Sequence, residues 1–196
     1  MKRSILIAAG AATALAIGAC RQSADPAAND EAATDNGALV NNAAADTSDP
    51  AAAPMAAADF ASTVAASDLY EIESGRLAAT KASGQGIRSF GQMLVADHQK
   101  STADLKAAAG QSSPPIEVAP KLTAERQAQI DQLKVASGPE FDRQFIQQQV
   151  AAHEKALAAV QGYAANGENQ ALKGFATKAS TVIQAHLDQL RGLGQQ

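Results

Sequence analysis

Residues 87–108 read IRSFGQMLVADHQKSTADLKAA, and the spacing of their apolar side chains decides the fold. Steps of three and four residues connect Ile87, Phe90, Leu94, His98, Ser101, Leu105 and Ala108. Residues spaced in this way share one face of an α-helix. The stretch therefore predicts a long amphipathic helix that buries this face.

The same helical period appears on both sides of this stretch, and glycine and proline divide it into segments. We expect helices over residues 59–82, 123–136 and 139–165, and a last helix that carries residues 172–193. Thr123 is the candidate N-cap of the short helix. No run alternates with the period of two that strands require. Two long hairpins joined by roughly 28 residues predict an all-α, ferritin-like four-helix bundle with a short extra helix in the crossover.

The N-terminal residues have the layout of a secretory signal peptide. Lys2 and Arg3 precede an uncharged apolar run over residues 5–17, which is too short to span a bilayer comfortably. The single cysteine of the chain, Cys20, follows the small residues of this run and resembles the lipidated cysteine of bacterial lipoproteins. We therefore expect removal of residues 1–19 and a lipid anchor at Cys20. An ordinary signal peptide with an incidental cysteine is the alternative.

Residues 21–58 are almost entirely Ala, Asp, Asn, Pro, Ser and Thr, with six acidic side chains and one basic side chain. Such a segment buries too little apolar surface to fold, so residues 20–58 are expected to form the lipidated cysteine and a disordered tether. The bundle domain is then residues 59–196. Arg21 follows the cysteine in place of the aspartate associated with inner-membrane retention. By that analogy we expect the periplasmic side of the outer membrane.

The charges of residues 59–196 are balanced and interspersed, with 14 acidic and 13 basic side chains. A nucleic-acid partner is not expected, because the chain has no basic stripe that could neutralise phosphates. Residues 84–86 (Gly-Gln-Gly) follow no predicted strand, so a nucleotide-binding loop is not expected either. The expected contacts are the membrane, through the lipid anchor, and envelope proteins.

All three histidines of the chain fall within apolar helix faces. His98, His153 and His186 belong to three different predicted long helices, and Glu71 projects from the buried side of the fourth. Three imidazoles and one carboxylate can form the coordination shell of a single Zn, Cu, Fe or Ni ion. A di-iron site is not expected, since the positions three residues before the histidines carry valine or isoleucine where a Glu-x-x-His motif needs glutamate.

The helix lengths place these groups at different heights. Glu71 and His98 are equally far from the turn at residues 83–86, so we expect them to be level. The midpoint between His153 and His186 falls past the turn at Gly167, which predicts a separation of several ångströms along the bundle axis. Convergence of all four groups is therefore not the expected arrangement.

A core hydrogen-bond network is the alternative to a metal site. In that network Glu71 accepts from His98, and the other histidines bond to the backbone or to glutamines such as Gln149. Asp97 points away from its neighbour His98 on the helix. We expect it to be an edge carboxylate that pairs with Lys100 or Ser101.

Several sequence blocks resemble those of the bacterial DUF4142 family. These blocks are EIESGRLA (71–78), FGQMLVADH (90–98), FD (141–142), QVAAH (149–153), LKGFA (172–176) and HL (186–187). The resemblance covers about residues 59–193 and implies a ferritin-like fold and an exported or outer-membrane location. The family has no established activity, so the resemblance implies neither a reaction nor a cofactor.

The sequence as a whole favours a lipid-anchored helical bundle of the cell envelope that is not an enzyme. No set of nucleophile, base and oxyanion donors is assembled along the chain. We expect a structural, interaction or stress-related role. The alternative is a ferritin-like protein that binds one transition metal ion through Glu71, His98, His153 and His186.

Overall fold

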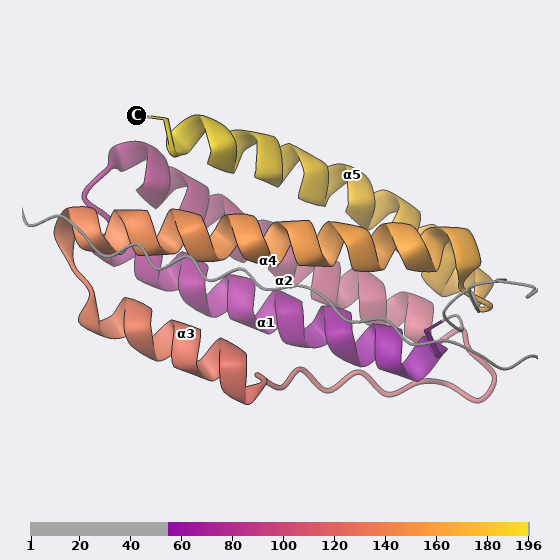
Figure 1. Cartoon of the computed structure of the whole chain (residues 1–196). Helices are drawn as coiled ribbons and strands as arrows, with labels where there is room; N and C mark the ends of the chain where they lie inside the picture. Colours follow the sequence, from indigo (N-terminus) through magenta and orange to yellow (C-terminus); the bar gives the residue numbers. More distant parts are fainter. Residues whose placement is uncertain (1–54, 196) are drawn as a thin grey trace, which may run out of the picture. The chain divides into compact units, whose positions relative to one another are not determined.

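The computed structural model describes residues 55–195, which form helices and no strand (Figure 1). The helices are α1 (Ala57–Lys81), α2 (Gln85–Ala109), α3 (Ala124–Val135), α4 (Gly138–Asn166) and α5 (Gln170–Leu193). The prediction of an all-α bundle is confirmed. Within residues 55–195, none of these helices combines the length and the hydropathy of a membrane span.

The four long helices form two antiparallel hairpins, α1–α2 and α4–α5. Each helix packs more closely against its hairpin partner than against the other hairpin, where α1 lies against α4 and α2 against α5. The crossover between α2 and α4, residues 110–137, runs the length of the bundle. Its two ends lie at opposite ends of the molecule, where each is held by hydrogen bonds. Ser112 accepts a hydrogen bond from Asn169 Nδ2 at 2.8 Å, while Asp142 of α4 accepts from the backbone N–H groups of Ser83 and Gly84 at 2.9 Å. This is the ferritin-like arrangement.

The short helix α3 packs along the outside of the bundle against α1 and α4 (Figure 1). Thr123 caps it as expected, since its Oγ1 accepts from the backbone N–H of Arg126 at 3.2 Å. Gly138 follows with a φ of 57°, a left-handed conformation that costs glycine little. The chain can therefore reverse direction sharply between α3 and α4.

One domain boundary needs a small correction. Residues 57 and 58, which we assigned to the tether, lie in the first turn of α1. They are alanines, and alanine has the highest helix propensity of all residues, so the helix extends past the expected boundary. The predicted signal peptide, the lipidation at Cys20 and the tether up to residue 54 lie outside the described residues.

The core contains two large apolar clusters with a polar layer between them, and a small third cluster of Tyr70, Ile130 and Ala152. One large cluster contains Phe60, Val64, Leu105, Val160, Leu172 and Phe175, and the other contains Phe90, Leu94, Phe141, Phe145 and Leu190. Between them lie the buried polar side chains of Asp68, Glu71, Ser74, His98, Gln149, His153 and His186. Because burying polar groups is costly unless they find partners, this layer is the part of the fold that requires a functional explanation.

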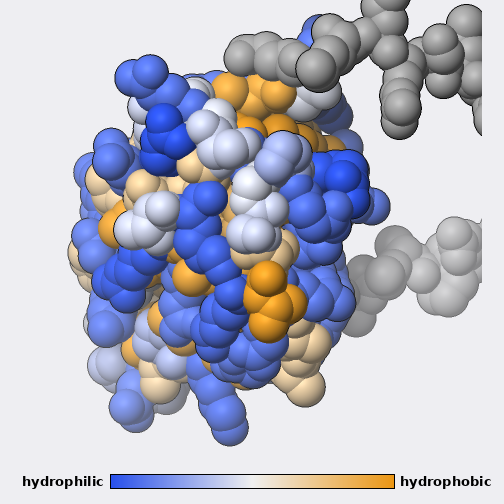
Figure 2. Space-filling view, turned by 90° about the vertical axis from the view of Figure 1, so that its left-hand side faces the viewer, coloured by the Kyte–Doolittle hydropathy of each residue, from blue (hydrophilic) through white to orange (hydrophobic). Residues whose placement is uncertain are grey.

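Two glycines allow α1 and α2 to approach closely beside this layer. A Cβ atom added to Gly75 would lie 2.7 Å from the carbonyl oxygen of Gly91, and one added to Gly91 would lie 2.7 Å from the carbonyl oxygen of Gly75. The end of the molecule seen in Figure 2, by contrast, is mostly hydrophilic, with small separate apolar patches. The close contacts between helices described here thus lie inside the bundle.

Candidate metal centre

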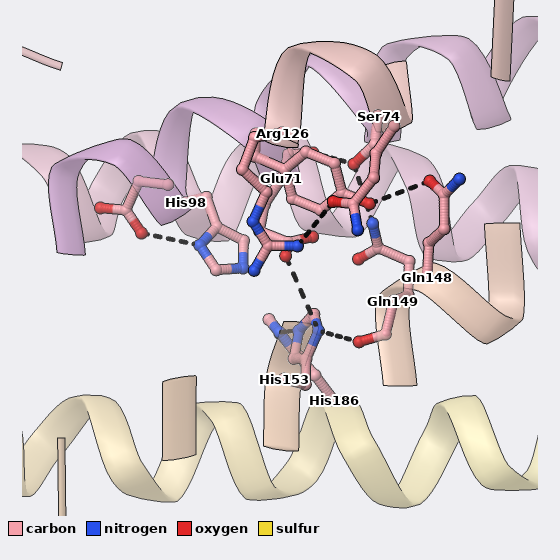
Figure 3. A network of polar contacts seen from close by, with 11 residues as sticks. Glu71, Ser74, His98, Arg126, Gln148, Gln149, His153 and His186 are labelled. Atoms are coloured by element: carbon pink, nitrogen blue, oxygen red, sulfur yellow. Dashed lines mark hydrogen bonds and ion pairs between the residues drawn. The ribbon is translucent and has the colours of Figure 1, made fainter. Parts of the chain in front are cut away.

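The three histidine side chains meet inside the bundle. His98 comes from α2, His153 from α4 and His186 from α5, and one ring nitrogen of each lies within 4.8 Å of the others. All three residues are buried, with exposed fractions of 8%, 1% and 3% respectively. Figure 3 shows the rings of His153 and His186 close together, with His98 approaching from the side. The polar layer therefore contains every imidazole of the chain.

The axial offset between His153 and His186 does not keep their ring nitrogens apart, contrary to our expectation. His153 Nε2 and His186 Nδ1 are only 3.3 Å apart, although His186 lies further along α5 from the α4–α5 loop than His153 lies along α4. This difference of three residues corresponds to about 4.5 Å of helix rise. Side chains on a helix lean toward its N-terminus, so His186 leans toward the α4–α5 loop and His153 leans away from it. These opposite inclinations bring the two rings to nearly the same height.

In each histidine, the ring nitrogen that points away from the cluster lies within hydrogen-bond distance of its own acceptor. His98 Nδ1 lies 2.8 Å from Asp68 Oδ1, His153 Nδ1 lies 2.9 Å from the carbonyl oxygen of Gln149, and His186 Nε2 lies 2.9 Å from Asp97 Oδ2. Carboxylate and carbonyl oxygens only accept, so these nitrogens carry the proton and donate. The lone pairs of neutral rings then belong to His98 Nε2, His153 Nε2 and His186 Nδ1.

Burial and neighbouring charges affect the three rings differently. Burial, followed by the charges of His98 and His186, lowers the pKa of His153 to about 3. Burial also lowers the pKa of His186, against the opposing effect of the hydrogen bond that it donates to Asp97. For His98 burial again acts downward, but the Asp68 hydrogen bond and the Glu71 charge outweigh it and raise the pKa overall. The lowered pKa values favour the neutral forms of His153 and His186.

Glu71 lies beside the histidine cluster and is not part of it. Its Oε1 is 3.9 Å from His153 Nδ1, on the side away from the converging nitrogens, and its Oε2 has no hydrogen-bond partner among residues 55–195. Burial is the main cause that raises the pKa of Glu71 to about 7. The expectation that Glu71 accepts from His98 is wrong, because Asp68 holds that position.

The role of Asp68 was missed from the sequence, although a signal for it was present. Asp68 and His98 are equally far along the chain from the turn that joins α1 to α2, so the two are level across the hairpin. Asp68 also lies one helical turn before Glu71 and shares its helix face. The side-chain oxygens of Asp68 are fully engaged, since Oδ2 also accepts from Thr102 Oγ1 at 3.1 Å.

The expected partners of Asp97 are also wrong. Asp97 accepts from His186 of α5, while Lys100 pairs with Asp104 one turn further along α2. Adjacent residues on a helix point about 100° apart. His98 can therefore face the interior while Asp97 points to the neighbouring helix α5.

A second set of polar side chains lies around Glu71 on the side of α3 and α4 (Figure 3). Gln149 Nε2 donates to Ser74 Oγ at 2.9 Å, and Tyr70 Oη donates to Gln148 Oε1 at 3.1 Å. The guanidinium of Arg126 from α3 lies 4.3 Å from the centre of the Tyr70 ring. These contacts form a mostly buried network on the α3 and α4 side of the polar layer.

Comparison with known proteins supplies the family. The sequence profile described as "Domain of unknown function (DUF4142)" matches residues 22–193. The chain belongs to the DUF4142 family. No curated protein matches it significantly in sequence.

Solved structures of similar fold include three forms of one protein, described as "CopM in the Cu(II)-bound form", "CopM in the Cu(I)-bound form" and "CopM in the Ag-bound form (by co-crystallization)". The TM-scores with this DUF4142 chain are 0.61, 0.61 and 0.60, and the sequence identities are 17%, 18% and 18%. Each match covers 72% of this chain and 96–97% of the other. At this level of identity the likeness shows a shared helical-bundle fold.

Proposed function

We propose that this DUF4142 protein binds a single copper ion through His98 Nε2, His153 Nε2 and His186 Nδ1. The observation that carries the proposal is the convergence of three buried ring nitrogens whose opposite ring nitrogens are all held by acceptors. Metal-binding histidines usually donate their other N–H to a carboxylate or a carbonyl, which sets the tautomer and the ring orientation. Asp68, Gln149 and Asp97 supply these acceptors.

The distance between the facing nitrogens of His153 and His186 fits a metal ion. Two nitrogens at the usual 2.0–2.1 Å from a tetrahedrally coordinated ion are about 3.4 Å apart. His153 Nε2 and His186 Nδ1 are 3.3 Å apart. The third nitrogen, His98 Nε2, is buried and has no hydrogen-bond partner within the described part of the chain.

The protonation of the His153 and His186 rings also favours a bound metal ion. With Gln149 and Asp97 holding the outer protons, His153 Nε2 and His186 Nδ1 present lone pairs to each other at 3.3 Å. A hydrogen bond between them would need a second proton on one ring, and the lowered pKa values of both rings oppose this. A cation bound by both nitrogens satisfies both lone pairs without a further proton.

Copper is the preferred ion on chemical grounds. Imidazole nitrogen binds zinc, copper, iron and nickel, and for a given set of ligands Cu(II) binds most tightly among the divalent first-row metals. The fold is that of CopM, which has been solved with copper and with silver. Glu71 is left out of the ligand set because its carboxylate lies nearest to His153 Nδ1, the nitrogen that Gln149 already holds, and because the converging ligand atoms come from the three histidines alone.

Metal content of the purified protein tests the proposal. The full chain would be purified in mild detergent without a histidine tag, incubated with equimolar Cu, Zn and Fe salts, desalted and analysed by mass spectrometry. We expect about one copper per chain, and little in His98→Ala or His186→Ala. Because the chain has only three histidines, nitrogen hyperfine splitting in the Cu(II) electron paramagnetic resonance spectrum would identify the same site.

Two further variants serve as controls. Gln99→Ala changes an exposed neighbour of His98 and should leave the copper content unchanged. Cys20→Ser removes the only thiol, which could bind Cu(I) independently. If the parent protein retains no copper, or if the histidine variants retain as much as the parent, the buried histidines form a structural hydrogen-bond network instead.

We also propose that the protein is anchored to the periplasmic side of the outer membrane through a lipid on Cys20. This rests on the sequence around Cys20, which lies outside the described residues. Cell fractionation tests it. The parent should sediment with outer membranes, and Cys20→Ser should appear in the soluble periplasmic fraction. Membrane association of both proteins to the same extent would contradict the lipid anchor.

A further inference from the structure

The three acceptors that hold the histidines differ strongly in their exposure to solvent. The side chain of Asp68 is 3% exposed and Gln149 is fully buried, whereas the side chain of Asp97 is 41% exposed. His186, to which Asp97 is bound, is itself buried. Asp97 is therefore the one acceptor that contacts both a histidine of the cluster and the solvent.

A pocket leads from the surface to the cluster on this side. His98 and His186 both line it, and so do Asp97 and Ser101 of α2 and Ala179 and Val182 of α5. Most of these side chains are small, and α2 packs less closely against α5 than against α1. The same pocket is also lined by Asp68 of α1 and Arg126 of α3, so the groove between α2 and α5 is one part of a larger depression beside the cluster.

We propose that copper reaches and leaves the histidine cluster along the groove between α2 and α5, and that Asp97 captures the ion at the mouth of this groove. Asp97 is also the positioning residue of His186, whose ring it holds with Nδ1 toward the cluster. The proposal rests on the proposed copper-binding function. It adds the route of the ion and assigns a residue that acts on the rate of binding.

The charge on Asp97 makes a kinetic prediction. A carboxylate at the mouth of a groove attracts a divalent cation, and this attraction is screened by salt. Removing the charge in Asp97→Asn should slow the association of Cu(II) by about fivefold at about 0.1 M ionic strength. The association rate of this variant should also depend less on salt than that of the parent.

Two matched variants separate this role from other effects of a carboxylate. Asp68→Asn changes the same kind of carboxylate–histidine contact at a buried position, so it should alter copper dissociation more strongly than copper association. Asp104→Asn removes an equal charge from the same groove two helical turns away from Asp97. This variant should keep the association rate within about twofold of the parent, because the screened interaction weakens with distance.

Substitutions of Val182 provide an independent test. Val182 lines the groove one turn before His186 and is 46% exposed, so it tolerates a polar replacement. Val182→Lys places a positive charge at the mouth of the groove and should slow Cu(II) association. The neutral Val182→Gln should not.

Stopped-flow absorbance of the copper–imidazole bands, with the full chain in detergent and Cu(II) as the probe, measures these rates. Circular dichroism checks that each variant is folded. If Asp97→Asn and Val182→Lys bind copper as fast as the parent, or if Asp104→Asn is slowed as much as Asp97→Asn, the route is wrong while copper binding stands. If the parent takes up no copper at all, the proposed function fails and the route fails with it.

Discussion

The close approach of α1 and α2 at Gly75 and Gly91 offers a sharp test of the packing that positions His98. Gly91→Ala adds one methyl group in the middle of α2. The added Cβ would lie 2.7 Å from the carbonyl oxygen of Gly75, 2.8 Å from Ala78 Cβ and 3.0 Å from the backbone nitrogen of Ala79. Two of these three atoms belong to the backbone of α1, so the contact cannot be relieved by rotating a side chain.

The size of the effect follows from two opposing contributions. Replacing glycine by alanine inside a helix stabilises it by about 1 kcal/mol. Overpacking of a well-packed site costs about 1–3 kcal/mol, and the cost should be near the upper end here because whole helices must separate. We therefore expect Gly91→Ala to lower the free energy of unfolding by about 2 kcal/mol. The double variant with Gly75→Ala should cost less than the sum of the single variants, because one separation of the helices relieves both contacts.

Urea denaturation of the metal-free protein, followed by circular dichroism at helix-sensitive wavelengths, measures this difference. Gly162→Ala and Gly174→Ala are matched controls, since both glycines lie within exposed helix surfaces and an added Cβ has no atom within 4 Å. Both controls should gain up to about 1 kcal/mol. A Gly91→Ala protein as stable as these controls would refute the packing explanation.

The remaining predictions concern the polar layer, the cap of α3 and the contact of Asp142 with the α1–α2 turn. Glu71→Gln should become more stable relative to the parent by about 3 kcal/mol between about pH 4.5 and about pH 8, measured by urea denaturation of both proteins. The pKa of Glu71 is raised to about 7 from 4.5, so its contribution to stability is fully present below pH 4.5 and is lost as the pH rises through 7. A difference between the two proteins that does not change with pH would contradict an ionising Glu71. Thr123→Ala should destabilise by about 1 kcal/mol through loss of the α3 cap, with exposed Thr80→Ala as a comparison. Asp142→Asn, which weakens the contacts with the N–H groups of Ser83 and Gly84, should lower the melting temperature by a few degrees, and an unchanged value would show that these hydrogen bonds add nothing.

Part of the candidate site could be predicted from the sequence because helical periodicity fixes which residues share a face. His98, His153 and His186 fall within the apolar stripes of three helices, and a buried stripe must face the bundle interior. The interior location of Glu71 follows in the same way. The lipid anchor at Cys20 also comes from a local pattern, and it stays a prediction because Cys20 lies outside the described residues.

The sequence by itself determined the helices, their order, the bundle fold and the inward direction of the histidines, because these follow from spacing and from turn residues along the chain. Only the tertiary structure decided the contacts between side chains of different helices. The approach of His153 to His186 depends on the direction in which each side chain leans, and the pairing of Asp97 with His186 depends on the rotation of α2 toward α5. Shifts of a few ångströms decide these contacts. Periodicity gives the face of a residue, but the height and rotation of one helix against another are set by the packing of the whole core.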